Sequence, residues 1–213
     1  MEINKKLIKF NTSSRNGTKI KYIVIHDTGN KNKGANAEAH FKYFNGGNRN
    51  ASAHYFVDET QVLQLVEDDV ASWAVGDGKS KYGISNSNSI SIEICVNSDG
   101  NYGVAVQKTI ELTKHLMDKH NIPIENVVRH YDASRKNCPA SMSKNDWEAW
   151  KAFKIALGRV VDKPTVKVKI NGKIHNMDGV FQNDKNYVGV RELAEALGYK
   201  VGWDQANKVV VIE

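Results

Sequence analysis

The chain has 213 residues, of which 40% are hydrophobic, and 30 basic against 24 acidic side chains give it a formal net charge of +6. This composition supports a folded core and excludes wholesale disorder. No apolar run reaches the roughly 18 residues that a membrane span needs, and two cysteines exclude a disulfide-rich scaffold. The modest basic excess favours polyanionic partners, such as an anionic cell wall. Because no basic stripe is interleaved with aromatic residues, we do not expect a nucleic-acid partner.

The first region, to about Leu157, mixes the patterns of strands and helices. Its run KYIVIH, residues 21–26, is short and β-branched, which is typical of a buried strand. Similar runs predict three further strands, and apolar residues at helical spacing predict three helices (strands 54–57, 61–66 and 90–96; helices 37–44, 106–117 and 147–157). Ser143 and Asp146 have the spacing of a capping box at the start of the last helix. We therefore expect an α/β domain at residues 1–160, with a mixed central β-sheet flanked by helices.

A second region follows a brief linker at Asp162–Pro164. It contains the patterns of a strand, a turn, a short helix ended by Gly198 and a last strand (165–170, Asn171-Gly172, 190–197 and 209–212). We expect a small second α+β domain at residues 165–213.

Two histidines and one cysteine stand where they could bind a metal ion. His26 ends the first buried strand, His130 follows the apolar pair Val127-Val128 and Arg129, and Cys138 lies eight residues after His130. Two imidazoles and one thiolate suit zinc, and three protein ligands leave a fourth position for water or substrate. From spacing alone, the alternative remains that these histidines are ordinary polar residues at the ends of strands.

Two charged residues are candidates for catalysis. Glu93 lies within a strand whose other face is Ile and Val, where a carboxylate is costly to bury without a partner. Either it faces solvent or it accepts a proton from water as a general base. Lys136, two residues before Cys138, either places a cation near a developing oxyanion or is a solvated loop lysine.

Four motifs together resemble a known family. VIHDTG, SAHYFVD, SIEICVN and RHYDASRKNCP, in this order, are similar to motifs of the zinc-dependent N-acetylmuramoyl-L-alanine amidases of type 2. That family includes many phage endolysins and shares its fold with the animal peptidoglycan recognition proteins. The resemblance covers residues 1–158 and implies that His26, His130 and Cys138 bind zinc. It also implies that Glu93 activates water and that Lys136 polarises the scissile carbonyl or stabilises the oxyanion.

The resemblance extends to residues around this centre. His54, in SAHYFVD, resembles a histidine of the active-site floor with a structural or supporting role. Another branch of the family uses a catalytic tyrosine where Ala53 stands, so Glu93 would carry more of the catalysis here. Relatives often have Ala-Trp-His-Ala-Gly where this chain has Ser-Trp-Ala-Val-Gly at 72–76, so Ala74 removes one possible substrate contact. Trp73 either shapes the substrate groove or packs in the core, and Cys95 is expected to be a buried free thiol.

The implied reaction is hydrolysis of the amide bond between N-acetylmuramic acid and the L-alanine of the peptidoglycan stem, by zinc-activated water, as in an endolysin or autolysin. The main alternative is a non-catalytic peptidoglycan-binding module, against which Cys138 and Glu93 argue. A second alternative is a hydrolase with Cys138 as nucleophile and His130 as base.

The second region resembles the small module related to the N-terminal stalk domain of copper amine oxidases, with Gly189 where relatives usually have proline. We transfer no copper site. Wall-polymer binding is the function that we expect for it, with dimerisation or simple spacing as alternatives. Tyr187, Tyr199 and Trp203 are candidate contacts, although Trp203 is expected to pack in the core.

The N-terminal residues MEINKKLIKFNTSS contain lysines but no apolar segment of the kind found in secretory signals. This fits a phage lysin that stays in the cytoplasm of a Gram-positive host and acts at the cell wall when the membrane is breached. A host autolysin of prophage origin would have the same features.

Overall fold

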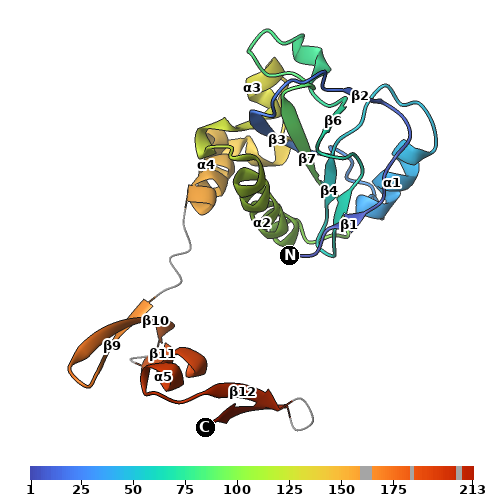
Figure 1. The fold of residues 1–213 in the computed structure, drawn as a ribbon. Helices are drawn as coiled ribbons and strands as arrows, with labels where there is room; N and C mark the ends of the chain where they lie inside the picture. Colours follow the sequence, from blue (N-terminus) through green and yellow to red (C-terminus); the bar gives the residue numbers. More distant parts are fainter. Residues whose placement is uncertain (159–164, 183–184, 205–207) are drawn as a thin grey trace. The chain divides into compact units, whose positions relative to one another are not determined.

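A computed structural model describes residues 1–158, 165–182, 185–204 and 208–213 (Figure 1). The chain divides into two compact units, Met1–Gly158 and Arg159–Glu213. Among the described residues, no helix is both long and apolar enough to cross a membrane.

A mixed six-stranded sheet forms the centre of the first unit. Its strand order is β1-β5-β4-β7-β3-β8, in which β4 and β5 pair antiparallel and the other neighbours pair parallel. A separate two-stranded sheet pairs β2 with β6. The bounds are β1 Asn4–Lys5, β2 Thr12–Ser14, β3 Tyr22–Asp27, β4 Tyr55–Val57, β5 Val62–Gln64, β6 Val70–Ser72, β7 Ser89–Ile94 and β8 Val127–Arg129.

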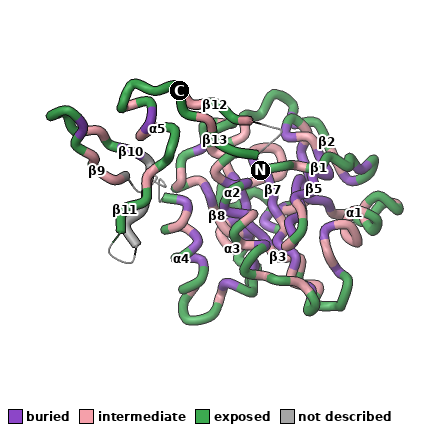
Figure 2. Tube along the Cα trace, turned by 90° about the horizontal axis from the view of Figure 1, so that it is seen from below, coloured by how far each residue is buried: buried purple, intermediate pink, exposed green. Residues whose placement is uncertain are grey.

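Helices cover both faces of this sheet. The long helices α2 (Tyr102–His120) and α4 (Lys144–Gly158) pack with the isoleucines of β3 and β7 in the larger apolar cluster. The helix α1 (Ala37–Asn45) packs on the other face, against Phe56 and Leu63. Figure 1 shows the sheet between these layers, and Figure 2 shows that its central strands are buried. The expected α/β architecture is confirmed.

The short helices of this unit lie in its loops and help to position the site. α3 spans His130–Ser134 and follows β8 directly, and the remaining ones are single turns (η1 Gly76–Gly78, η2 Ile124–Asn126 and η3 Ala140–Met142).

The expected capping box of the last helix is wrong, although the helix itself is present. The Ser143 hydroxyl donates to the carbonyl of Ala140 at 2.9 Å, and the Asp146 carboxylate accepts from Lys151 at 2.7 Å. The residues Asn145–Trp147 have positive φ values of 50°, 52° and 63°. The Ser143 hydroxyl is thus bonded within the turn η3, and the backbone angles of the next residues are not those of a right-handed helix. The reciprocal side-chain bonds of a capping box therefore do not form.

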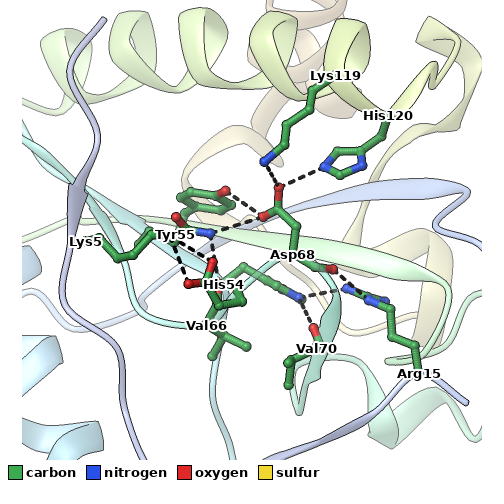
Figure 3. A network of polar contacts seen from close by, with 11 residues as sticks. Lys5, Arg15, His54, Tyr55, Val66, Asp68, Val70, Lys119 and His120 are labelled. Atoms are coloured by element: carbon green, nitrogen blue, oxygen red, sulfur yellow. Dashed lines mark hydrogen bonds and ion pairs between the residues drawn. The ribbon is translucent and has the colours of Figure 1, made fainter.

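A buried carboxylate connects α2 to the loop after β5 (Figure 3). Asp68 accepts hydrogen bonds from the Tyr55 hydroxyl at 2.6 Å and from the Lys119 ammonium at 2.7 Å. The Nε2 of His120 lies 2.8 Å from the same carboxylate. The guanidinium of Arg15, itself buried, donates to the Asp68 backbone carbonyl at 2.8 Å. Segments far apart in the sequence are therefore joined at one acidic side chain.

The second unit contains a three-stranded antiparallel sheet, a helix and a two-stranded ribbon. The sheet order is β11-β10-β9, and Asn171 and Gly172 form the expected turn with φ values of 48° and 84°. The expected linker at Asp162–Pro164 lies outside the described residues. The bounds are β9 Thr165–Ile170, β10 Lys173–Gln182, β11 Lys185–Val188, α5 Val190–Ala196, β12 Val201–Asp204 and β13 Val209–Ile212.

The expectation that Trp203 packs in a core is wrong, since this residue is 55% exposed. Trp203 lies in β12, which among the described strands pairs only with β13. A two-stranded ribbon has too little surface to enclose a tryptophan.

Candidate metal centre and active site

The parallel strands bring the candidate residues to one edge of the sheet. His26 lies near the carboxyl end of β3, and its partner in the register of β7 is Glu93. The strand β8 pairs with the other side of β3 and leads directly into α3, whose first residue is His130. In parallel sheets, functional groups gather at the carboxyl ends of the strands. Cys138 joins them because its carbonyl accepts a hydrogen bond from the Tyr131 N–H at 3.0 Å.

His26, His130 and Cys138 form a compact, buried group of donor atoms. One candidate ligand atom from each residue lies within 4.8 Å of the others, and the two imidazole centroids are 4.5 Å apart. The buried Nε2 of His26 and Nδ1 of His130 have no hydrogen-bond partner among the described residues. Buried polar atoms are normally paired, so two unpaired nitrogens beside a thiol fit a bound metal ion.

Burial also sets the protonation of these groups. It lowers the pKa of both histidines, which favours the neutral imidazoles that bind metals. Burial, together with the nearby Glu93 carboxylate, raises the pKa of the Cys138 thiol to about 12. A bound cation reverses this effect, because it stabilises the thiolate directly.

Glu93 faces this donor group and not open solvent. Its side chain is 18% exposed, and its Oε1 lies 3.8 Å from the Nδ1 of His26. Burial and the neighbouring Asp27 raise the pKa of Glu93 to about 8, and Oε2 is buried without a hydrogen-bond partner among the described residues. The other residues on this face of β7, such as Ser91, are buried as well. A carboxyl group in this state can exchange protons near neutral pH.

Lys136 and Trp73 line the same cavity as the donor group. This cavity has a volume of about 170 Å³, and its lining includes His26, Glu93 and Cys138. A second cavity of about 350 Å³ is lined by Trp73, Lys136, His130 and polar residues that include Asn50 and Asn86. A third, of about 300 Å³, is more apolar and shares Glu93, Phe44 and Phe56 with the first. Trp73 is 37% exposed, so its alternative placement in the core is wrong.

His54 does not line any of these three cavities. It is fully buried, its Nδ1 accepts the Ser91 backbone N–H at 3.0 Å, and its Nε2 lies 3.0 Å from the Val70 carbonyl. Burial and the adjacent Arg15 lower the pKa of His54 to about 3. Its neutral ring therefore supports neighbouring strands and has no surface for substrate. Cys95 is a buried free thiol, as expected.

Sequence reasoning missed Asp77. Its Oδ1 lies 2.9 Å from the Nε2 of His130, although 53 residues separate the two in the chain. The only local signal is an aspartate between two glycines, which ordinarily indicates a turn.

Comparison with known proteins identifies the family. Residues 16–141 match the sequence profile of the Amidase_2 family, described as N-acetylmuramoyl-L-alanine amidase. The chain belongs to this family. The resemblance read from the four motifs is therefore confirmed. Residues 166–213 match the profile of the copper amine oxidase N-terminal domain, which confirms the resemblance of the second region.

Similar members of the family come from Bacillus subtilis. The N-acetylmuramoyl-L-alanine amidase XlyA is 38% identical over 137 residues, which cover 64% of this chain and 44% of XlyA. The amidase CwlH is 37% identical over 132 residues, covering 62% of this chain and 50% of CwlH. The chain thus spans about half the length of the curated relatives that it matches. The solved catalytic domain of XlyA aligns with a TM-score of 0.66 and 34% identity, covering 74% of this chain and 100% of that domain.

Proposed function

We propose that this chain is a zinc-dependent peptidoglycan hydrolase that cleaves the amide bond between N-acetylmuramic acid and the L-alanine of the stem peptide. The observation that carries the proposal is a pair of buried imidazole nitrogens, on His26 and His130, that have no partner among the described residues and share one cavity with Cys138 and Glu93. Membership in the amidase family supports the choice of bond.

His26, His130 and Cys138 would hold the zinc ion, which supplies Lewis-acid activation of water and of the scissile carbonyl when bound. Glu93 takes a proton from the attacking water and delivers it to the departing amine of L-alanine. Its raised pKa of about 8 suits both halves of this transfer, because the group gains and loses a proton near neutral pH. The low exposure of its side chain keeps bulk water from competing for the proton.

Lys136 stabilises the negative charge that develops on the carbonyl oxygen. Lys136 is exposed on the loop before Cys138 and lines both the cavity at the donor group and the neighbouring polar cavity. A cation at this position is worth more in the transition state than in the ground state, because the oxyanion forms only as water adds.

The cavities suggest how the substrate lies. The apolar cavity beside α1 suits side chains of the stem peptide, whereas the polar cavity with Trp73 and two asparagines suits a sugar. Both share residues with the central cavity at the donor group.

The second unit would bind a polymer of the cell wall and so concentrate the enzyme there. Its support is the exposure of Tyr187, Tyr199 and Trp203, since aromatic rings open to solvent are common contacts for carbohydrate and polymer ligands. The site of action would be the cell wall, which the protein reaches when the membrane is breached.

The test measures products of purified protein acting on Gram-positive peptidoglycan, before and after zinc removal. We expect new L-alanine amino termini that disappear on chelation and return with added Zn²⁺. Activity that persists without metal would instead indicate Cys138 as nucleophile. New reducing ends would show that a glycosidic bond is cut, and binding without products would indicate a recognition module.

A further inference from the structure

The loop between β6 and β7 places a carboxylate behind one of the two histidines. The Oδ1 of Asp77 lies 2.9 Å from the Nε2 of His130, a hydrogen-bond distance. His130 is 3% exposed, and its other nitrogen, Nδ1, is the buried atom that has no partner among the described residues. The ring thus has one nitrogen held by a carboxylate, and its other nitrogen is buried without a partner among the described residues.

Asp77 is held in place although 47% of its side chain is exposed. The next residue, Gly78, packs so tightly on α3 that an added Cβ would lie 2.1 Å from the Ala133 carbonyl oxygen. Before it, Val75 is buried with Ala133, and its N–H donates to the Asn86 side chain at 2.8 Å. The loop is therefore fixed on the helix that begins with His130.

A second contact joins the same loop to Arg135, the C-terminal cap of α3. The guanidinium of Arg135 stacks over the ring of Tyr82 at 4.2 Å. Two residues that flank the Asp77 turn, Val75 and Tyr82, therefore both contact α3 or its C-terminal cap.

A carboxylate at Nε2 determines which nitrogen of His130 carries the proton. A neutral imidazole has one N–H, and an ionised carboxylate can only accept. The N–H must then be at Nε2, which leaves a lone pair on Nδ1 for a metal ion. Nearly half of the Asp77 side chain is open to water, which solvates the ionised carboxylate.

We propose that Asp77 is a positioning residue that holds His130 in the tautomer and orientation in which Nδ1 is free to bind metal. The inference rests on the proposed function, because that function requires the zinc ion to which Nδ1 of His130 would bind. The carboxylate near His26 does not hold its ring in the same way: Glu93 lies 3.8 Å from Nδ1, which is too far for a hydrogen bond. The effect of Asp77 is therefore specific to one of the two histidines.

The test compares Asp77→Ala, Asp77→Asn and the control Asp146→Asn in the full chain. Asp146 is an aspartate whose side chain is 89% exposed and pairs with Lys151 on α4. One measurement is the Zn²⁺ dissociation constant, determined by competition with a chromophoric chelator. The other is the tautomer of His130 in the metal-free protein, read from long-range ¹⁵N–¹H NMR correlations of the imidazole.

We expect Asp77→Ala to weaken zinc binding by about 10- to 100-fold, as is usual when the carboxylate behind a metal-binding histidine is lost. In its metal-free form, His130 should show a mixture of tautomers in place of Nε2–H alone. Asp77→Asn should lie between Ala and wild type, because the amide oxygen still accepts a hydrogen bond. Gly78→Ala, which displaces the loop and leaves Asp77 intact, should weaken zinc binding as well. The control should match wild type.

Zinc binding by Asp77→Ala within threefold of wild type would overturn the inference, as would a His130 tautomer that does not change. The near-isosteric Asp77→Asn keeps the test decisive if Asp77→Ala fails to fold. Activity reports on the proposed function separately: wild-type protein that binds zinc but releases no L-alanine termini would contradict that function and leave the role of Asp77 standing.

Discussion

His26 and Glu93 are register partners on the adjacent parallel strands β3 and β7, with 3.8 Å between Nδ1 and Oε1. Side chains of paired residues project to the same face of a sheet. The backbone ladder therefore places the candidate proton carrier beside a candidate metal ligand without help from any loop. Because the two roles lie on different residues, a substitution of Glu93 tests proton transfer without removing the metal ligand His26.

Glu93→Gln removes the proton carrier and keeps its shape. We expect kcat for amide hydrolysis to fall by about 10²- to 10⁴-fold, the usual contribution of general acid–base catalysis. The Zn²⁺ dissociation constant should stay within a few-fold, because Glu93 is not one of the three donor residues. Steady-state kinetics on a soluble muramoyl peptide would measure kcat, and competition with a chromophoric chelator would measure the dissociation constant, with the exposed Glu111→Gln as control. Activity within tenfold of wild type would contradict the role.

Lys136→Met removes the cation but keeps most of the apolar stem of the side chain. We expect kcat to fall by about 10²- to 10³-fold, the cost of losing one group that stabilises an oxyanion. The KM value should change little, because the charge acts mainly in the transition state. The exposed Lys144→Met, at the start of α4, is the matched control. A rise in KM with unchanged kcat would show that Lys136 binds substrate instead.

Asp68→Asn should destabilise the first unit without touching the donor group. The carboxylate accepts from Tyr55 and Lys119 while only 7% of its side chain is exposed. Weakening such buried, charge-assisted bonds costs on the order of 1–3 kcal/mol in free energy of unfolding. Urea unfolding at pH 7 would measure the loss, with the neighbouring exposed Asp69→Asn as control. Equal stability of the two variants would contradict this prediction.

The same carboxylate predicts how stability depends on pH. Burial raises the pKa of Asp68, but hydrogen bonds from Lys119, Tyr55 and His120 outweigh burial and lower it. A depressed pKa in the folded state gives stability that is fully present above the unfolded value of about 3.9 and is lost as the pH falls through the folded value. The stability difference between wild type and Asp68→Asn should therefore shrink below about pH 4. A stability difference between the two proteins that stays constant down to pH 2 would contradict this prediction.

The exposed aromatic residues of the second unit test the proposed wall binding. Replacing Tyr187, Tyr199 and Trp203 together by alanine should reduce sedimentation of the protein with intact cell walls. Turnover of a soluble muramoyl peptide should not change, because the proposed chemistry lies entirely in the first unit. Ile174→Ala, another exposed apolar residue of the second unit, serves as control. Unchanged sedimentation of the triple variant would show that these rings do not bind the wall.

Local patterns were sufficient for most elements of the fold. The β-branched run before His26 became β3, and the apolar spacing near Ile110 became α2, because burial of one face follows directly from periodicity. The capping box at Ser143 did not form, because the Ser143 hydroxyl donates to the Ala140 carbonyl and the Asp146 carboxylate accepts from Lys151 instead. Trp203 was misplaced because hydropathy does not show whether a ribbon has anything to pack against.

By itself, the sequence determined which residue types are available for the chemistry and on which elements they lie: His26 at the end of a strand, Glu93 within one, and His130 and Cys138 after another. Only the tertiary structure decided that Asp77 meets His130 across 53 residues, and that Asp68 meets Lys119 across 51. The physical reason is that periodicity reports which face of an element is buried, whereas such contacts depend on the path of a loop. That path is set by packing constraints such as the close approach of Gly78 to Ala133, which no local pattern encodes.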